Sequence, residues 1–329
     1  MADNQTTPLL TVEDLKTYLF LKRGIVKAVD GVSFQLNEGE TLGIVGESGC
    51  GKTMTCLSIL RLIPEPAGRI VGGKIVLDGT DIVGLNEKEM ASQYRGSKIS
   101  MISQDPLTSL NPVFSIGDQV GGPFRYHGLE KSRKGIKKAV IDVLKRVRIP
   151  SPEHRLKEYP YQFSGGMRQR VSAAMAIACG PRLLIADEPT SALDVTIQVQ
   201  LLQLLEDIQK QTGVGLIMIT HDLGVAAYIC QRIAVMYAGR IVELADVKTI
   251  YKNPSHPYTQ ALLNSVPRLG EKKDRLYNIE GQPPNLLNPP EGCAFWPRCD
   301  QASDICREEY PPQTPLDGQG FVSCWVRSQ

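Results

Sequence analysis

Residues 41–53 read Thr-Leu-Gly-Ile-Val-Gly-Glu-Ser-Gly-Cys-Gly-Lys-Thr. The first five residues form a short, mainly apolar strand pattern, and residues 54–62 have the apolar spacing of a helix. The loop between them satisfies G-x-x-x-x-G-K-[ST] in the strand–loop–helix context that a phosphate-binding loop requires. This stretch therefore predicts an α/β domain that binds the phosphates of a nucleotide.

Each part of the loop has an expected task. Its glycines let backbone N–H groups turn toward the phosphates, and the following helix presents its positive end to the same anion. Lys52 is expected to reach the β- and γ-phosphates, and the Thr53 hydroxyl to take a Mg²⁺ position. The residues predicted to contact nucleotide here are Gly46, Glu47, Ser48, Gly49, Cys50, Gly51, Lys52 and Thr53.

A second segment supplies acidic groups. The apolar run 183–186 reads as a buried strand and ends in Asp187 and Glu188. An acidic residue at this strand end holds Mg²⁺ in P-loop enzymes, which is the role expected of Asp187. Glu188 is placed to polarise the attacking water. The alternative is that both are solvated acidic residues of a loop, and the presence of a phosphate-binding loop makes this alternative less favoured.

The remaining pattern supports an α/β fold. Strand patterns alternate with helix patterns, which favours a mostly parallel sheet. Three strand patterns near the N-terminus predict a small antiparallel sheet, at 9–15, 25–36 and 70–77. Further strands are expected at 98–103, 183–186 and 215–220, a hairpin at 233–244, and helices at 116–126, 131–147, 167–178 and 196–210.

Prolines become frequent after about residue 246, where only 258–266 looks helical. A domain boundary is therefore expected near residue 245, between a nucleotide-binding domain (1–245) and a small, irregular domain rich in Pro and Cys (246–329). Four of the eight cysteines crowd into this tail, at Cys293, Cys299, Cys306 and Cys324. Four thiolates suffice for zinc or an iron–sulfur cluster, and the absence of a C-x2–4-C pair favours the cluster; unligated thiols are the alternative.

Composition excludes some functions. The formal net charge of +2 gives no basic footprint for nucleic acid. No apolar run approaches the ~18 residues that a spanning helix needs, and residues 1–7 do not resemble a signal peptide. A membrane role would therefore require docking onto another protein.

Four more short motifs make a resemblance specific. Gln104 in Ser-Gln-Asp-Pro resembles a Q-loop, 163–167 (Phe-Ser-Gly-Gly-Met) resembles the LSGGQ signature, 191–194 (Ser-Ala-Leu-Asp) resembles a D-loop, and His221 resembles a switch histidine. In this order over residues 9–245, the motifs resemble the nucleotide-binding domain of ABC transporters. The family implies a P-loop core with an antiparallel β subdomain and a helical subdomain at about 105–178.

The resemblance also implies a mechanism. Two such domains sandwich two ATP molecules head to tail, so that Ser164, Gly165 and Gly166 face the γ-phosphate held by the partner. His221 would bond that phosphate and orient Glu188, while Gln104 would reach Mg²⁺ and water and sense a permease. The implied catalytic residues are Lys52, Gln104, Glu188 and His221; Thr53, Gln104 and Asp187 hold Mg²⁺, and Asp194 joins the nucleotide-binding set.

Some positions depart from the family pattern. Met167 stands where the family usually has Gln, and Phe163 where it usually has Leu. The adenine-stacking aromatic is expected to be Tyr18 or Phe20, although the family position can also fall on Leu19 between them. It is equally consistent with the sequence that Tyr18 and Phe20 are aromatic side chains of the strand core.

The tail resembles the C-terminal extension of dipeptide and oligopeptide importer ATPases, on residues 253–263 and on the segment around Cys293 and Cys299. Part of that family carries a [4Fe–4S] cluster on such cysteines, with Zn²⁺ as the alternative here. The resemblance implies an ATPase that uses ATP and Mg²⁺ to drive peptide import from the cytoplasmic face of the membrane. Implied partners are a second, related ATPase subunit, two permease subunits that touch 104–126, and, indirectly, an extracytoplasmic substrate-binding protein.

Other functions remain open at this point. Nickel and sugar importers share the same architecture. A non-transport ABC ATPase is less favoured, because Lys52 and Ser164 are not separated by sustained heptads and the chain has one such domain. A P-loop kinase would leave the signature and D-loop unexplained.

Overall fold

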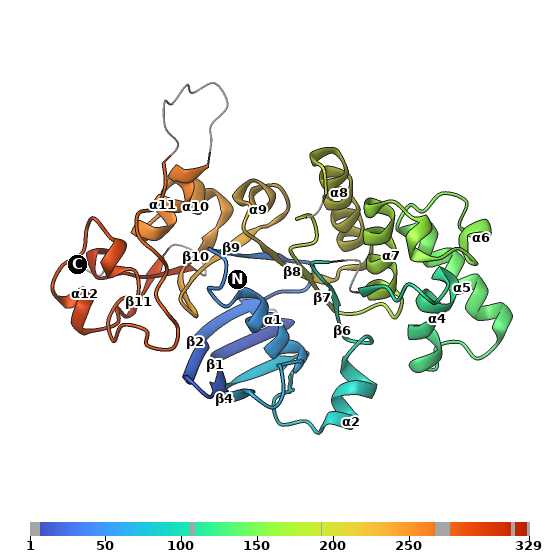
Figure 1. The fold of residues 1–329 in the computed structure, drawn as a ribbon, viewed down its shortest axis with the longest axis horizontal. Helices are drawn as coiled ribbons and strands as arrows, with labels where there is room; N and C mark the ends of the chain where they lie inside the picture. Colours follow the sequence, from blue (N-terminus) through green and yellow to red (C-terminus); the bar gives the residue numbers. More distant parts are fainter. Residues whose placement is uncertain (1–6, 106–108, 192, 267–276, 317–319, 328–329) are drawn as a thin grey trace, which may run out of the picture. The chain divides into compact units, whose positions relative to one another are not determined.

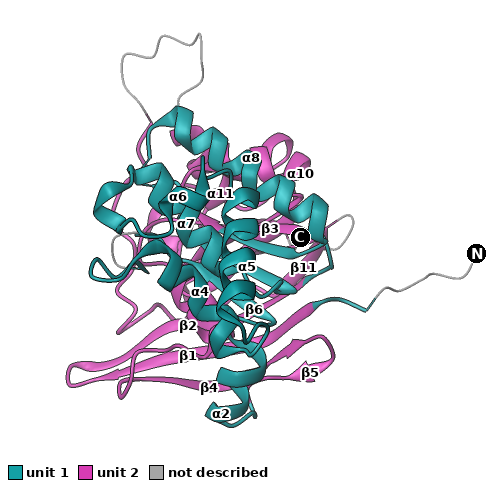
Figure 2. Cartoon of the chain, turned by 90° about the vertical axis from the view of Figure 1, so that its right-hand side faces the viewer, with its two compact units in different colours: residues 1–9, 36–40, 84–218 teal, residues 10–35, 41–83, 219–329 magenta. Residues whose placement is uncertain are grey.

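The computed structural model describes residues 7–105, 109–191, 193–266, 277–316 and 320–327. These residues form two compact units, which Figure 2 shows in different colours. Unit 1 comprises residues 1–9, 36–40 and 84–218, and unit 2 comprises residues 10–35, 41–83 and 219–329. The phosphate-loop stretch and the C-terminal tail therefore belong to the same unit, although they lie far apart in the sequence.

Unit 2 contains the predicted antiparallel sheet. Its strands are β1 (Leu10–Leu21), β2 (Gly24–Leu36), β4 (Gly68–Leu77) and β5 (Thr80–Asp81), in the order β2-β1-β4-β5. Leu10 lies opposite Leu77 in the antiparallel β1–β4 pair. The apolar residues Leu10, Val12 and Leu15 are buried, which gives β1 the one-sided core face that its sequence predicts.

A second set of strands in unit 2 carries the phosphate loop. Within unit 2 these strands follow the order β11-β12-β10-β9-β3. Their bounds are β3 (Thr41–Val45), β9 (Arg232–Tyr237), β10 (Arg240–Asp246), β11 (Gln313–Leu316) and β12 (Gly320–Ser323). β3 is parallel to β9, and β9 and β10 form the predicted hairpin. Its turn residues Ala238 and Gly239 both have positive φ, at 48° and 82°, as a tight hairpin turn requires.

The C-terminal tail has more regular structure than the sequence predicts. Besides the predicted helix, observed as α11 (Pro257–Ser265), it contains α10 (Val247–Lys252), α12 (Ile305–Glu308) and two 3₁₀ turns, η3 (Trp296–Arg298) and η4 (Trp325–Arg327). β12 pairs with β10, where Val322 lies opposite Glu243, so the tail extends the sheet of unit 2. The domain boundary near residue 245 stays a prediction.

Unit 1 is built from helices and two parallel strands, β6 (Ile99–Ile102) and β7 (Leu183–Asp187). Its main helices are α4 (Ile116–Tyr126), α5 (Arg133–Arg146), α6 (Pro152–Arg155), α7 (Gly165–Ile177) and α8 (Val195–Thr212) (Figure 1). Shorter elements are α2 (Glu87–Glu89), η1 (Met90–Tyr94) and η2 (Pro160–Gln162). Ser115, Ser132 and Ser164 each cap a helix by accepting a backbone N–H, which explains where α4, α5 and α7 begin.

The remaining elements are α1 (Lys52–Leu60) and α9 (Leu223–Ile229) in unit 2, and β8 (Gly215–Thr220), which runs from unit 1 into unit 2. The strands and helices expected from the sequence are present, with shifts of a few residues at their ends. Among the described residues, no helix combines the length and the apolarity needed to cross a membrane.

Candidate functional site

The phosphate loop follows the buried strand β3 and leads into α1. The ammonium group of Lys52 donates hydrogen bonds to the carbonyls of Gly46 and Glu47, at 2.8 and 2.9 Å. Gly46 and Gly51 have positive φ, and a Cβ at either position would lie 2.2 Å from a backbone carbonyl oxygen. Only glycine fits at these two positions, so the sequence motif is also a packing requirement of the loop.

The middle of the loop is open to solvent. Ser48 and Gly49 are exposed, and Thr53 is exposed in the first turn of α1. Cys50 is buried, and its burial raises the pKa of the thiol above the ordinary value. The Cys50 side chain therefore stays protonated at neutral pH and serves as a small apolar group.

Acidic residues of unit 1 lie where the sequence predicts them. β7 ends at the buried Asp187, and Glu188 follows with φ = 43°. A left-handed conformation is uncommon outside glycine and is often found at functional sites. The amide of Gln104 donates a hydrogen bond to the Glu188 carboxylate at 3.3 Å, so the structure brings these two predicted site residues together.

The signature segment of unit 1 has both local and outward-facing features. The Ser164 hydroxyl accepts the Met167 N–H at 3.3 Å and caps α7. Because the Met167 backbone makes this contact, the cap does not depend on the usual Gln side chain. A Cβ on Gly166 would lie 2.6 Å from Ile197, whereas a Cβ on Gly165 would have no neighbour closer than 4.0 Å in the part of the chain that the structure describes. A methyl group at Gly166 would therefore have to displace Ile197, whereas a methyl group at Gly165 has room beside Leu193.

The D-loop segment leads into α8. The Asp194 carboxylate accepts the Ile197 N–H at 3.0 Å and caps this helix. Ser191 is exposed and its hydroxyl donates to the Glu188 carbonyl at 3.1 Å. Ala192 lies outside the described residues. Asp194 therefore has a structural role in addition to any contact with nucleotide.

The predicted site residues divide between the two units. Unit 1 carries Gln104, Asp187, Glu188, the signature and Asp194, while unit 2 carries the phosphate loop, the N-terminal aromatics and His221. His221 is exposed directly after β8. Its neighbour Asp222 caps α9 by accepting the N–H groups of Gly224 and Val225.

Two aromatics of β1 differ in accessibility. The Tyr18 hydroxyl donates to Asp30 at 2.6 Å, and Arg240 donates to the same carboxylate at 2.7 Å. Burial raises the pKa of Tyr18 to about 12, and the hydrogen bond to Asp30 adds to the shift. Phe20 is 42% exposed, with the Arg69 guanidinium 5.6 Å from its ring centre. Tyr18 is thus held in a polar network, whereas the Phe20 ring is partly exposed, and which of them stacks on adenine stays a prediction.

The four tail cysteines line one cavity of unit 2 together with His256 and aromatic residues. Burial raises the pKa of Cys293 to about 12. The His256 ring accepts the Tyr258 N–H at Nδ1, which places the imidazole proton on Nε2, and Nε2 is buried without a hydrogen-bond partner. Within the described residues, no three His, Cys, Asp or Glu side chains are arranged as a metal-binding group. The four thiols therefore share one cavity with the His256 N–H, and a metal at these thiols stays a prediction.

One contact of the phosphate loop was not predicted from the sequence. Arg298, from the 3₁₀ turn η3, forms two hydrogen bonds with the Glu47 carboxylate. The partners lie 251 residues apart, so no local pattern could join them. The only available signal is that Arg298 directly precedes Cys299 in the cysteine-rich segment.

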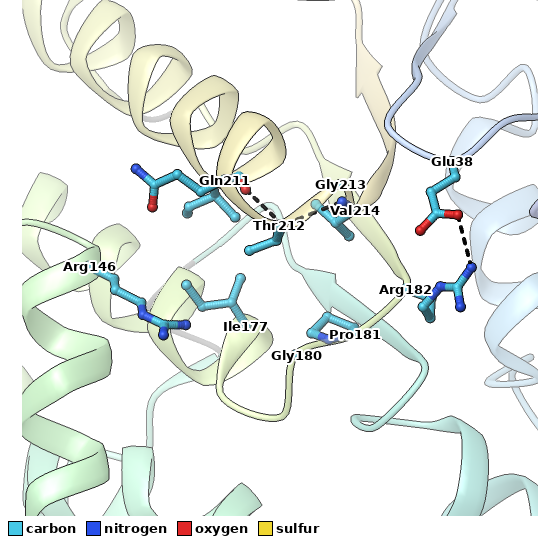
Figure 3. Close-up of a pocket in the computed structure, with 11 residues that line it drawn as sticks. Glu38, Arg146, Ile177, Gly180, Pro181, Arg182, Gln211, Thr212, Gly213 and Val214 are labelled. Carbon is cyan, nitrogen blue, oxygen red and sulfur yellow. Dashed lines mark hydrogen bonds and ion pairs between the residues drawn. The ribbon is translucent and has the colours of Figure 1, made fainter.

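A separate cavity of about 260 Å³ lies in unit 1 (Figure 3). Apolar side chains such as Ile177 and Val214 line it beside Arg146 and Arg182, and Arg182 pairs with Glu38 at 3.2 Å. None of the predicted site residues lines this cavity. This cavity is therefore not the candidate nucleotide site, which lies at the sequence motifs.

Comparisons with known proteins agree with these observations. Residues 29–191 match the family model "ABC transporter", and residues 242–306 match the model "Oligopeptide/dipeptide transporter, C-terminal region". A dipeptide transport ATP-binding protein of Bacillus subtilis is 49% identical over 98% of this chain and 95% of its own length. A probable peptide ABC transporter ATP-binding protein of Sinorhizobium fredii is 48% identical over 96% and 94%.

Solved structures show the same fold. A dimeric ATP-binding cassette in a post-hydrolysis state, bound to ADP and Pi, superposes with a TM-score of 0.65 at 25% identity, over 72% of this chain and 98% of that one. Part of an ABC transporter complex from Clostridium perfringens gives a TM-score of 0.64 at 26% identity, over 75% and 92%. The chain therefore belongs to the family of ABC transporter ATP-binding proteins, in the branch that carries the oligopeptide/dipeptide transporter C-terminal region.

Proposed function

We propose that this chain is the ATP-hydrolysing subunit of an ABC importer for dipeptides and oligopeptides. The Gln104–Glu188 hydrogen bond carries the enzymatic part of the proposal, because it holds a carboxylate at the end of β7 where a hydrolytic water must be activated. The substrate class is supported by the tail match and by near-full-length similarity to peptide transport proteins. Nickel and sugars are the alternative cargoes.

The motif residues have distinct proposed roles. The Lys52 ammonium neutralises the β- and γ-phosphates, and backbone N–H groups of the loop bind the same oxygens. Thr53 and Asp187 are each proposed as ligands of Mg²⁺, which would supply positive charge beside the phosphates. Glu188 accepts a hydrogen bond from the attacking water, and His221 donates one to the γ-phosphate.

A second ATPase subunit is proposed to complete the site. Gly165 has free space around it, as expected for a backbone that another molecule approaches closely. Val195, next to the capping residue Asp194, is 76% exposed, and Tyr161 is also exposed shortly before the signature. Exposed apolar side chains at both segments favour a protein partner. We infer a head-to-tail arrangement with a related but distinct subunit.

The permease contact is proposed for residues 104–126 of unit 1. Val113, Phe114 and Tyr126 are large apolar side chains that are exposed in or just beyond this segment, and Leu129 follows them. Such a grouping is typical of a protein-binding surface. Docking there on two permease subunits would hold the chain peripherally at the cytoplasmic face of the membrane, with the extracytoplasmic binding protein acting only through the permease.

The tail cysteines are proposed to hold a [4Fe–4S] cluster, with Zn²⁺ as the alternative. Cys293, Cys299, Cys306 and Cys324 would be the ligands, and the free N–H of His256 would stabilise negative charge on sulfur. Iron and zinc analysis of protein purified without oxygen decides between them. About four irons per chain with absorbance near 400 nm supports the cluster; zinc, or neither metal, rejects it.

An uptake experiment tests the cargo. Cells whose only copy of this chain carries Glu188→Gln are compared with cells that carry the unchanged chain, using labelled dipeptides, labelled nickel and labelled sugars. The proposal expects loss of dipeptide uptake alone. Loss of nickel or sugar uptake with normal dipeptide uptake would assign the alternative cargo.

A further inference from the structure

The tail holds the side chain of a phosphate-loop residue. The Arg298 guanidinium donates to both carboxylate oxygens of Glu47, at 2.7 and 3.0 Å, and also to the Tyr237 hydroxyl at 3.2 Å. The side chain of Arg298 is only 4% exposed. The Glu47 side chain is 26% exposed, so water reaches only the carboxylate side of the pair. A bidentate pair with a buried guanidinium has a more fixed geometry than an exposed ion pair.

The tail also holds the backbone of the same residue. The Glu47 N–H donates to the Tyr258 hydroxyl at 2.9 Å. Tyr258 is fully buried at the start of α11, with its ring 4.5 Å from Tyr237 and 5.3 Å from Phe295. Glu47 is therefore fixed at both its side chain and its amide by residues that lie more than 200 positions later in the chain.

Both supports begin at the wall of the cysteine-lined cavity. Arg298 belongs to the turn η3 between Cys293 and Cys299, where the Trp296 N–H donates to Cys293 O and the Cys299 N–H donates to Trp296 O. Tyr258 donates its own N–H to His256, which lines the same cavity. A displacement of the cavity wall would thus move both groups that hold Glu47.

We propose that Arg298 and Tyr258 are positioning residues of the nucleotide site, through which the cysteine-rich tail sets the affinity of the phosphate loop for ATP. The proposal rests on the ATPase function proposed above. Its physical basis is charge: Glu47 places a carboxylate within a loop that must bind a polyanion, and Arg298 neutralises that carboxylate. Tyr258 fixes the direction of the adjoining peptide, on which the orientation of the loop amides depends.

The test measures affinity for Mg-ATP, with a fluorescent ATP analogue, on the full-length chain assembled with its partner subunit. Arg298→Ala leaves Glu47 uncompensated and is expected to raise the Kd on the order of tenfold, the effect of losing a charged hydrogen-bonded pair. Arg298→Lys keeps the positive charge but cannot form the bidentate pair with Glu47. Its Kd for Mg-ATP should therefore lie between those of the unchanged chain and Arg298→Ala. Adding Glu47→Gln to Arg298→Ala removes the uncompensated carboxylate and should restore most of the affinity.

Arg307→Ala is the matched control. Arg307 belongs to the same tail and stacks on Trp296 at 4.8 Å, and among the described residues it has no hydrogen bond or ion pair with the phosphate loop. It should leave the Kd unchanged. An equal rise in Kd for Arg307→Ala and Arg298→Ala, or no rescue by Glu47→Gln, would mean that general loosening of the tail explains the effect, and would overturn the proposal.

Two further outcomes keep the test decisive. If Arg298→Ala does not fold, Tyr258→Phe removes only the acceptor oxygen, and an unchanged Kd for this variant overturns the role of Tyr258. If the unchanged chain itself fails to bind Mg-ATP, the proposed ATPase function fails, and the contacts of Glu47 are structural only. A positioning role is supported if Arg298→Ala raises the Kd for Mg-ATP but leaves kcat at saturating ATP within about twofold of the unchanged chain. In that case binding of the ground state and the transition state is weakened equally, without loss of catalysis.

Discussion

The Gln104 amide donates its hydrogen bond to Oε2 of Glu188, across 84 residues of sequence within unit 1. The pair thus combines a group able to accept a proton with a neutral group that orients it. Since Gln104 begins the segment proposed to meet the permease, its displacement would alter the orientation of the carboxylate proposed to be catalytic.

Glu188→Gln is predicted to bind ATP but to lose turnover. The amide keeps the size of the side chain but cannot accept a proton, so kcat should fall by about 10²- to 10⁴-fold, the usual contribution of a general base. The Kd for Mg-ATP should change little. Steady-state hydrolysis and equilibrium binding check this, with Glu206→Gln, a surface position paired with Lys210 in α8, as the control. Turnover near that of the unchanged chain would mean that Glu188 is not the base.

Phe20→Ala and Tyr18→Phe are predicted to separate stacking from structure. If Phe20 stacks on adenine, Phe20→Ala should weaken the binding of ATP by about 1–3 kcal/mol, the range for base–aromatic stacking. The binding of inorganic triphosphate, which has no base, should not change. Tyr18→Phe should leave both affinities alone and lower the free energy of unfolding by about 1–3 kcal/mol, because the bond to Asp30 is lost. Competition binding and denaturant unfolding give the two readouts. If Tyr18→Phe weakens the binding of ATP and Phe20→Ala does not, Tyr18 is the residue that stacks on adenine.

Local motifs made much of the molecule predictable. A few neighbouring residues determine each of three features: the phosphate loop, the carboxylates at the end of β7 and the hairpin at Ala238–Gly239. Turn chemistry and strand periodicity act over short distances, so such features can be predicted from the sequence. The capping roles of Ser164 and Asp194 follow from the same local rules, although the family motifs predict only nucleotide contacts for these residues.

Long-range pairings could not be predicted in this way. β11 contains Pro315 and β12 has only four residues, so neither has the periodicity of a strand. β12 pairs with the edge of β10, and β11 in turn pairs with β12. The Arg298–Glu47 pair depends on that tail docking as well. The four cysteines were recognisable by their crowding, but spacing alone could not show that His256 shares their cavity.

Asp30 is predicted to make folding sensitive to acid. Its burial raises the pKa of the carboxyl, but hydrogen bonds from Tyr18 and Arg240 outweigh that effect and leave the pKa below the ordinary value of 3.8. A carboxyl whose pKa is lower in the folded state stabilises folding above the unfolded pKa, and this stability is lost as the pH falls through the folded pKa. The loss therefore lies below about pH 4.

Asp30→Asn isolates this contribution from the other carboxylates. The variant should be less stable than the unchanged chain at pH 6, because Arg240 loses its charged partner, and the difference should shrink as the pH falls toward 3. Chemical unfolding at several pH values between 3 and 6 measures it. A difference that stays constant over this range would show that Asp30 does not titrate with the predicted linkage.

Gly165→Ala and Gly166→Ala are predicted to fail for different reasons, although they are neighbours in one helix turn. At Gly166 the added methyl meets Ile197 at 2.6 Å inside the chain, so the free energy of unfolding should fall by about 1–3 kcal/mol, as expected for overpacking. At Gly165 the methyl has room, so the fold should be unaffected while hydrolysis by the assembled pair falls about 10²-fold, because the methyl blocks close approach to a phosphate. Unfolding and ATPase assays on both variants separate the effects. Full ATPase activity in Gly165→Ala would contradict a partner-supplied signature contact, because then nothing outside the chain needs a glycine there.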